Sequence, residues 1–407
     1  MALIGWLVGW TLVVGARFDT MLTAQEIARL RFRSLGLASN AQGGSANVVR
    51  HLLAMQAQDL FQVCWAVGQR CGQTLAQVEA ALDEGQVVRS WPMRSTLHLV
   101  CPEDLGWLLA LTTDRLIGAA AARRRQRLGL DLPTIERVRG IVEVALSGGN
   151  ALTRSELFAQ VSEAGVELGP NWSYHLTWYL AQTGTLVWGP TRAGEPLLVL
   201  SSEWLEPAEE LDRDEALRQL ALRFVGSRGP VTDLDLARWI GLPLGQVRLG
   251  LQAAGTALEQ VEGHDGRTYW LARQAMDSPG PAIPGLALLA AFDEHILGYA
   301  DRSAQLPVEY APKVCPGNSG VFRPTMVANG VTIGTWRGPA RSVVARVPAT
   351  QPLSVNLAPF GPALALPITT QAVRQAAASH ARFLGRGGAV VTGLDSPIEA
   401  SADLVVA

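Results

Sequence analysis

Two glutamines set two positions apart are the residues of this sequence best suited to holding a water molecule. Gln56 and Gln58 flank Ala57 in the stretch Leu-Leu-Ala-Met-Gln-Ala-Gln-Asp. Side chains at positions i and i+2 point the same way on extended backbone, whereas on a helix they lie about 200° apart. The helix predicted from Val48 to Met55 therefore has to end before the pair if the two amides are to act together.

Each glutamine amide carries one carbonyl acceptor and two N–H donors. A pair on one face could hold a water by acceptor and donor together, or read the edge of a nucleobase. The other interpretation is a helix end with both amides in solvent. Because glutamine is a common surface residue, the residue types alone favour that second interpretation.

A second group of polar residues lies within the segment from Val87 to Val100, whose β-branched and alternating residues are typical of strands. On the two-residue period of a strand, Arg94, Thr96 and His98 share one face. A histidine between leucines on a half-buried strand is more often a hydrogen-bonded core residue than a catalyst. The arginine and threonine beside it favour a functional role, so both interpretations remain open.

The one conspicuous basic patch is predicted on a helix that follows this segment. Its members are Arg115, Arg123, Arg124, Arg125, Arg127, Arg137 and Arg139. The run at 123–127 is either a solvated helix face or a stripe that binds phosphates. Arg302 and Arg337 lie at the ends of apolar stretches and allow either interpretation. The Asp-Glu-His stretch at 293–295 has metal-ligand residue types, but consecutive residues do not share a face, so packing is favoured.

Length and composition exclude several classes of protein. The chain has 407 residues, of which 48% are hydrophobic and 17% charged, so it can bury a sizeable core and is not disordered or collagen-like. The net charge is −2, so the molecule as a whole does not attract nucleic acid, and any such binding requires a local basic patch. Its four cysteines include no CxxC pair, which predicts a reduced, cytoplasmic setting without a metal site. No P-loop, GxSxG or HExxH motif is present.

The N-terminal stretch 2–16 is apolar but has no Lys or Arg before it. It is shorter than the roughly 20 residues that span a bilayer, so no membrane segment is predicted. A signal peptide is one interpretation. The one we favour is that translation starts at Met21, which makes residues 1–20 a non-native extension.

Three segments begin with the same helix-start signal. Thr23, Thr153 and Thr232 each stand three residues before an acid, as in a capping box. After the third, a helix ending at Gly241, a turn, and a second helix to Ala254 form a helix-turn-helix pattern. Helices followed by a pair of strands are typical of a winged helix, and the chain is predicted to contain three such units.

The region after the Pro/Gly-rich linker at 278–285 changes in character. Asn329-Gly330 between two strand-like runs indicates a type I′ hairpin. With a strand at 353–357 and a helix at 369–384, this region is predicted to be a small β-barrel or a sheet closed by a helix.

The predicted fold class is α+β, with tandem winged helices and a β-barrel-like domain. The predicted segments are an extension at 1–20, a first winged-helix unit with an inserted β-hairpin and the Arg-rich helix at 21–145, second and third units at 146–277, the β-barrel-like domain with its terminal helix at 286–385, and a tail at 386–407.

The chain resembles the AlkZ-type (YcaQ-like) family of winged-helix DNA glycosylases. The resemblance rests on four stretches in the family's order, Met-Gln-Ala-Gln-Asp at 55–59, Arg-Ser-Trp-Pro-Met-Arg-Ser-Thr-Leu-His-Leu-Val at 89–100, Ala-Phe-Asp-Glu-His-Ile-Leu-Gly-Tyr-Ala-Asp-Arg at 291–302 and Gly-Thr-Trp-Arg at 334–337. Similarity runs from Met21 to about Leu384. It implies tandem winged helices and a β-barrel domain around a concave, DNA-sized channel.

The resemblance also implies an activity and site residues. The catalytic glutamines of the family's Gln-apolar-Gln motif fall by position on Gln56 and Gln58, and a glutamine rather than an aspartate at the second position favours the crosslink-repair branch. The expected activity is that of a monofunctional glycosylase that removes N7-alkylated or interstrand-crosslinked purines from double-stranded DNA, as a monomer without metal or organic cofactor. The residues expected to contact DNA are Arg94, Thr96, His98, Arg123, Arg124, Arg125, Arg127, Arg302 and Arg337.

An N7-alkylated guanine is cationic and already a good leaving group, so neutral amides that orient water suffice in place of a general acid. A crosslinked base cannot be flipped into a tight pocket, which predicts an open cleft. The rival hypothesis is a non-catalytic winged-helix DNA-binding protein such as a transcription regulator. Against it, the second helix of the helix-turn-helix carries Arg248 as its only cation.

Overall fold

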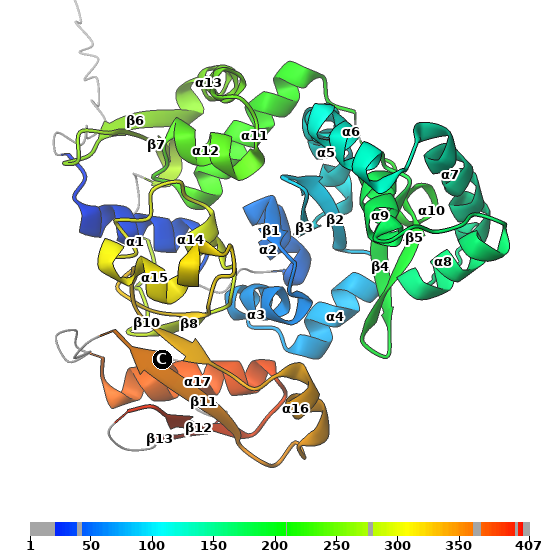
Figure 1. Cartoon of the computed structure of the whole chain (residues 1–407). Coiled ribbons are helices and arrows are strands. Elements are labelled where there is room, and N and C mark those ends of the chain that lie inside the picture. The colour runs from blue at the N-terminus through cyan, green and yellow to red at the C-terminus, as the bar shows by residue number, and fades with distance from the viewer. Residues whose placement is uncertain are drawn as a thin grey trace, which may run out of the picture.

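The computed structural model describes residues 21–38, 43–208, 210–275, 280–360, 368–394 and 398–401. The predicted extension at 1–20 lies outside these residues. The fold is mixed α+β, as predicted, and holds two sheets with a two-stranded hairpin between them in sequence (Figure 1). None of the described helices is both long and apolar enough to cross a bilayer.

The first sheet has five strands in the order β1-β3-β2-β4-β5. Their bounds are β1 Ala54–Gln56, β2 Val88–Met93, β3 Thr96–Val100, β4 Leu186–Arg192 and β5 Glu195–Leu200. The pairing of β2 with β4 joins the predicted first and second winged-helix units into one sheet, so a boundary at 145/146 does not separate two independent sheets.

The segment from 87 to 100 is a hairpin and not one strand. Arg94 and Ser95 form its turn with φ values of 49° and 56°, a left-handed conformation that reverses the chain. The prediction that Arg94, Thr96 and His98 share one face of a strand was therefore wrong for Arg94. The turn nevertheless brings Arg94 back over the strand, where its Nη2 lies 3.3 Å from His98 Nε2.

The described residues up to Trp204 also contain ten helices. They are α1 Ala24–Ser34, α2 Ser45–Leu52, α3 Leu60–Cys71, α4 Leu75–Asp83, α5 Pro102–Ile117, α6 Ala119–Leu128, α7 Leu132–Leu146, α8 Arg154–Glu163, α9 Trp172–Gln182 and α10 Ser201–Trp204. The capping boxes at Thr23 and Thr153 are confirmed. The predicted single Arg-rich helix is in fact α5, α6 and α7, because Gly118 and Gly129 interrupt it.

The helix-turn-helix pattern is confirmed. The region consists of α11 Arg213–Arg228, α12 Asp233–Ile240, α13 Leu244–Ala253 and the antiparallel strands β6 Leu258–Glu262 and β7 Thr268–Ala272. Thr232 caps α12, and Gly241 ends it in the left-handed conformation. Helix α1 packs against α11, and the bridge from Leu22 to Gly263 ties the start of the described chain to this region.

The second sheet has six strands in the order β13-β12-β11-β10-β9-β8 and carries α17 against it (Figure 1). The region consists of β8 Ala287–Leu289, α14 Glu294–Leu297, α15 Ala311–Val314, β9 Thr325–Ala328, β10 Val331–Arg337, α16 Arg341–Arg346, β11 Leu353–Pro359, α17 Thr370–Phe383, β12 Gly388–Thr392 and β13 Ile398–Ser401. Asn329 and Gly330 form the predicted turn, with φ values of 51° and 82°.

Of the two predicted alternatives for this region, the sheet closed by a helix is confirmed, and one further prediction needs correction. Within the described residues β8 and β13 are open edges and α17 packs against the sheet, so it is not a closed barrel. Residues 388–392 pair in parallel with β11, and 398–401 pair with them in turn, so most of the described part of the predicted tail belongs to the sheet. Parallel pairing requires a long crossover, here α17, which no local sequence signal reveals.

Four buried histidines make the fold sensitive to acid. Burial lowers the pKa of His98 and of His380 to about 3 and that of His175 and of His295 to about 4. In the unfolded chain each histidine has a pKa near 6.5, so below that pH the unfolded state binds protons that the folded state excludes. The free energy of unfolding therefore falls as the pH drops from about 6.5 toward 4, by up to about 1.4 kcal/mol per pH unit for each histidine.

Urea denaturation at about pH 7.5, 6 and 5 measures this loss of stability. In the variant His380→Gln, the free energy of unfolding should fall less steeply with decreasing pH below about pH 6. The slope should be smaller by about 1.4 kcal/mol per pH unit, because the variant lacks one histidine that is protonated only in the unfolded chain. Equal slopes for the variant and the wild type would mean that His380 does not resist protonation in the folded state.

Candidate active site

The predicted glutamine pair lies between two helices, with Gln56 as the last residue of β1 and Gln58 in the bend that follows it. Helix α2 ends at Leu53, whose φ of 64° turns the chain out of the helix, and β1 follows directly. Asp59 then starts α3, since its side chain accepts a hydrogen bond from the Gln62 N–H. The condition set by the sequence, a helix that ends before the pair, is therefore met.

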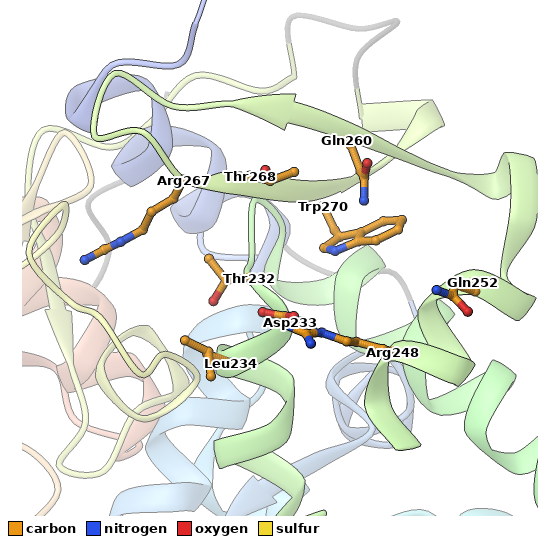
Figure 2. A pocket seen from close by; sticks show the side chains of 9 residues that line it. All are labelled: Thr232, Asp233, Leu234, Arg248, Gln252, Gln260, Arg267, Thr268 and Trp270. Atoms are coloured by element: carbon orange, nitrogen blue, oxygen red, sulfur yellow. Dashed lines mark hydrogen bonds and ion pairs between the residues drawn. The ribbon is translucent and has the colours of Figure 1, made fainter. Parts of the chain in front are cut away.

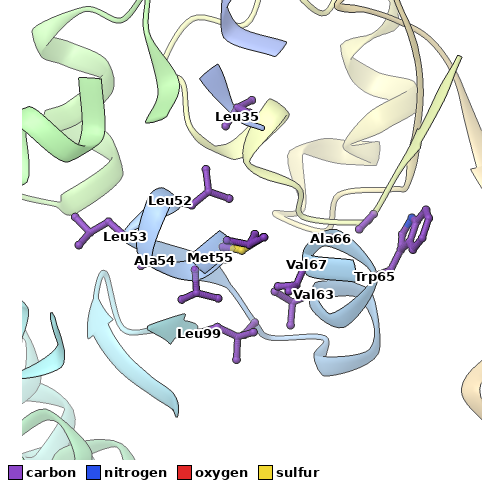
Figure 3. Close-up of a cluster of buried hydrophobic side chains, with 14 of the residues drawn as sticks. Leu35, Leu52, Leu53, Ala54, Met55, Val63, Trp65, Ala66, Val67 and Leu99 are labelled. Atoms are coloured by element: carbon purple, nitrogen blue, oxygen red, sulfur yellow. The ribbon is translucent and has the colours of Figure 1, made fainter. Parts of the chain in front are cut away.

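Strand β1 is held in place by apolar side chains on its buried face. Met55 points into a buried cluster with Val63 and Val67 of α3 and Leu99 of β3 (Figure 3). Because side chains alternate along a strand, burying Met55 turns Gln56 toward the opposite face of β1. Gln56 is half-buried there and Gln58 is exposed.

The two amides contact each other directly. Gln56 Nε2 donates a hydrogen bond of 2.5 Å to Gln58 Oε1. This bond fixes the orientation of both amides and leaves Gln56 Oε1 as an acceptor and Gln58 Nε2 as a donor. The Gln56 oxygen and the Gln58 nitrogen take no part in this bond, so the pair keeps an acceptor and donors that can bind a water molecule.

Two arginines hold the backbone on which the pair is carried. Arg89 on β2 donates from Nε to the Ala57 carbonyl at 2.8 Å and from Nη2 to the Gln58 carbonyl at 3.3 Å. Burial lowers the pKa of Arg89 to about 10. Arg228, at the end of α11, donates to the Ala54 carbonyl at 3.2 Å. The carbonyls at both ends of the segment are therefore fixed by charged donors.

Arg228 is in turn held by a buried carboxylate. It pairs with Glu294 of α14 at 2.8 Å, and both side chains are at most 1% exposed. The Trp239 indole N–H donates to the same carboxylate oxygen at 2.9 Å. The glutamine strand is thereby connected to α11, α12 and α14 through one buried network.

The stretch at 293–295 is structural, as the residue pattern favoured. Asp293 receives two hydrogen bonds from Arg70 of α3, at 2.8 and 2.9 Å, and is completely buried. His295 Nε2 lies 3.0 Å from the Gly330 carbonyl in the β9–β10 turn. These contacts join the second sheet to the helices that flank the glutamine pair.

His98 of β3 lies next to Gln56, on the strand that pairs with β1. The β1–β3 register pairs Gln56 with His98, and the β2–β3 register pairs His98 with Ser90, so these three side chains share one face. His98 Nδ1 lies 2.8 Å from the Thr96 carbonyl, so Nδ1 carries the proton and Nε2 accepts from Arg94. Burial and the neighbouring Arg94 charge lower the pKa of His98 to about 3, which keeps the ring neutral.

His98 is completely buried, which places it behind the surface and not among the residues that could touch DNA directly. Four buried polar atoms of this neighbourhood lack a hydrogen-bond partner within the described residues. They are Ser90 Oγ, Arg94 Nε, Thr96 Oγ1 and Glu294 Oε1. Buried polar groups normally have partners, so a polar interior of this kind beside the glutamines suits ordered water.

The predicted basic run lies on α6. Arg123, Arg124 and Arg127 are exposed, as a phosphate-binding stripe requires. Arg125 is half-buried, with its guanidinium 5.6 Å from the Tyr179 ring centroid. The structure thus offers three of the four arginines to a partner.

The other two predicted arginines differ from each other. Arg302 is half-buried, donates to the Ile296 carbonyl at 2.6 Å and lies over the Phe322 ring. Its bond to the backbone gives it a structural role in this conformation. Arg337, at the end of β10, is exposed.

Three residues that hold the glutamine segment, Arg89, Arg228 and Glu294, were not predicted from the sequence. Arg89 and Glu294 lie inside the stretches that carry the family resemblance, which was the available signal. Arg228 lies outside them, at the end of an ordinary amphipathic helix, and no pattern along the chain distinguishes it.

One group of metal-ligand residue types occurs within the described ranges, Cys101 with Glu103 and Asp104. The carboxylate of Glu103 binds Arg50, and that of Asp104 binds Arg223. Burial raises the pKa of the Cys101 thiol to about 12, which keeps it protonated and a poor metal ligand. These pairings give the group a structural role.

Comparison with known proteins places this site in a family. The sequence model of the family described as "DNA glycosylase AlkZ-like" matches residues 49–383, which include the glutamine pair. The chain is 25% identical over 346 residues to an "Interstrand DNA cross-link repair glycosylase" of Streptomyces sahachiroi, a match that covers 77% of this chain and 87% of that protein. The solved structure of Streptomyces sahachiroi DNA glycosylase AlkZ has a TM-score of 0.72 at 23% identity and covers 92% of this chain and 100% of its own, which shows the same fold. As its sequence motifs predicted, the chain belongs to the AlkZ-like DNA glycosylase family.

Proposed function

We propose that this protein hydrolyses the N-glycosidic bond of N7-alkylated purines in double-stranded DNA, including purines joined in interstrand crosslinks. The observation that carries the proposal is the hydrogen-bonded glutamine pair at the end of β1, which keeps an acceptor on Gln56 and donors on the exposed Gln58. The relative from Streptomyces sahachiroi, named for interstrand crosslink repair, supports the same substrate class.

In the proposed reaction the nucleophile is a water molecule that the two glutamine amides hold in position. Alkylation at N7 gives the purine a positive charge, so the bond between N9 and C1′ breaks with its electron pair going to the base. Gln56 Oε1 accepts a hydrogen bond from a water whose oxygen attacks C1′, and Gln58 Nε2 donates to that oxygen. Fixed amide dipoles also stabilise the positive charge that develops on the sugar. The attacking water loses its proton to solvent, and the products are the free base and an abasic site.

The remaining predictions about architecture and setting belong to the same proposal. The α11–α13 helices with the β6–β7 hairpin have the element order of a winged helix, which supports tandem winged-helix units along a concave, DNA-sized channel. The exposed arginines of α6 and Arg337 would bind phosphates, and Arg94 would lie behind the glutamines. We propose that the protein acts as a monomer in the cytoplasm, on the DNA of the nucleoid.

A base-release assay on two duplexes tests the proposal. One carries a single N7-methylguanine and the other a single N7-linked interstrand crosslink, and abasic sites are converted to strand breaks by alkali. We expect breaks at the modified position with the wild type and none in an unmodified duplex of the same sequence. Tight binding of all duplexes without base release would contradict the proposal and support a non-catalytic DNA-binding protein.

The variant Arg124→Ala should weaken DNA binding in a salt-dependent manner. Arg124 is exposed on α6, with its guanidinium 5.8 Å from the Tyr174 ring centroid. Loss of one phosphate contact should lower the slope of log K against log salt by about 1. Fluorescence anisotropy over a salt series measures this slope. Arg154→Ala, an exposed arginine of α8, is the matched control, and an equal loss of slope there would remove the special role of α6.

A further inference from the structure

A pocket lies in the helix-turn-helix region, between α13 and the β6–β7 hairpin (Figure 2). Its volume is about 510 Å³, within the range of ligand sites in proteins. None of its lining residues belongs to β1, α2 or α3, which carry and flank the glutamine pair. Any ligand of this pocket would therefore bind apart from the proposed reaction centre.

The wall of the pocket on the hairpin side is an aromatic surface. Trp270 of β7 is half-buried, with part of its indole packed against the core. In Figure 2 the indole faces the space between the hairpin and α13, with Gln260 of β6 above it. The strand register places Gln260 directly opposite Trp270, so an amide lies beside the ring. A half-exposed indole with a neighbouring amide is a typical surface for stacking a planar ring.

The opposite wall combines a donor and an acceptor. Arg248 of α13 donates from Nε to Asp233 Oδ2 of α12 at 2.7 Å, and 57% of the arginine side chain is exposed. Within the described residues, this bond leaves Asp233 Oδ1 and both Arg248 Nη groups without a partner. Nucleobases carry neighbouring donors and acceptors on their edges, so the Asp233–Arg248 pair complements such an edge.

The charges in the pocket favour a base over a phosphate. The positive charge of Arg248 is offset by Asp233 at contact distance. Arg267 bonds to Asp301 outside the pocket, and its side chain extends away from Trp270 in Figure 2. The space beside the indole is therefore close to neutral.

Helix α12 connects this pocket to the neighbourhood of the glutamines. Asp233, its first residue, lines the pocket, and Gly241, its C-cap, abuts the β2–β3 turn. A Cβ at Gly241 would lie 3.2 Å from Arg94 Cγ. At 1.5 Å rise per residue, the eight residues of α12 separate the two places by about 12 Å.

We propose that this pocket binds an unpaired nucleobase, stacked on Trp270 and hydrogen-bonded through its edge to Asp233 and Arg248. The proposal goes beyond the proposed function and rests on it only in taking DNA as the partner. A lesion that distorts the duplex frees neighbouring bases, and a pocket one helix length from the β2–β3 turn would hold such a base. The same chemistry would also accept a free nucleotide, so the test separates the two sources.

The test measures binding of a fluorescein-labelled single-stranded oligo-dT of about ten nucleotides by anisotropy. Trp270→Leu should weaken this binding about 10-fold or more, because base–aromatic stacking is lost while the apolar bulk is kept. Asp233→Asn keeps the shape of the edge and should weaken it about 5-fold. Leu249→Ala, an exposed residue of α13 that does not line the pocket, should bind as the wild type does.

Four further measurements interpret the result. The thermal midpoint establishes that Trp270→Leu is folded at the assay temperature. Affinity for an intact duplex should be unchanged in this variant, and equal weakening for duplex and single strand would overturn the proposal, as would no weakening at all. If dTMP displaces the labelled oligo-dT, a free nucleotide is a ligand of the pocket. If unlabelled oligo-dT displaces it and dTMP does not, the pocket binds a DNA strand. Base release from the N7-methylguanine duplex is measured on the same variants, so a failure of this pocket is distinguished from a failure of the proposed glycosylase activity.

Discussion

Replacing Gln58 by alanine should lower the rate constant of base release by about 100- to 1,000-fold, the effect of removing one preorganised donor from a reaction centre. The side chain is exposed, and its Nε2 carries two N–H donors that the bond to Gln56 does not use, since that bond involves only the Gln58 oxygen. Its loss removes the group that orients the attacking water but no charge that would bind phosphate. Affinity for DNA should therefore stay within about twofold.

Single-turnover kinetics at saturating protein, on the N7-methylguanine duplex, separate the two quantities. The double variant Gln56→Ala/Gln58→Ala should be little slower than the slower single variant, because the two amides act as one unit. Gln160→Ala, an exposed glutamine on α8, is the matched control and should leave the rate unchanged. A Gln58→Ala protein that lost affinity but kept the wild-type rate would show that the pair binds DNA without orienting water.

Replacing Arg228 by methionine should lower the free energy of unfolding by about 3–5 kcal/mol, the cost of breaking a buried ion pair from one side. Arg228 and Glu294 are at most 1% exposed, so the carboxylate left behind would be a buried, unpaired charge. The Ala54 carbonyl would lose its donor in the same step. Urea denaturation with linear extrapolation measures the change.

The double variant Arg228→Met/Glu294→Leu should recover much of this loss, because no unpaired charge remains. Arg50→Met, which breaks a pair that is about half exposed at both side chains, should change stability far less. If the surviving Arg228→Met protein also released base more slowly at saturation, the arginine would position the glutamine strand as well as stabilise the fold. Equal destabilisation by the single and double variants would contradict an electrostatic origin.

The sequence by itself determined the features that depend on neighbours a few residues apart. The caps at Thr23, Thr153 and Thr232, the helix-turn-helix and the Asn329-Gly330 turn all appear where the residues predict them. Each rests on hydrogen bonds or backbone conformations confined to one turn of chain, so residue type and spacing are enough to specify it. The mixed α+β fold and the family could be predicted for the same reason, from short motifs in a fixed order.

Only the tertiary structure decided how the two glutamines are arranged and which residues hold them. Residue types alone favoured solvated amides, and the structure shows two amides bonded to each other at the end of strand β1. That strand is held by Arg89, 32 positions from Ala57, and by Arg228, 174 positions from Ala54. Both arginines look like ordinary basic residues along the chain, because a contact between residues so far apart leaves no periodic signal.

The same reason explains the errors in the predicted architecture. The sheet that joins β2 to β4 and the parallel strands β11 and β12 are pairings between distant segments. The burial of His98, which removes it from the predicted DNA-contacting residues, likewise follows from how the strands and the β2–β3 turn pack. Local sequence specifies which segments become helices, strands and turns. Which strands pair, which side chains are buried and which groups hold the glutamines depend on contacts that exist only in the folded chain.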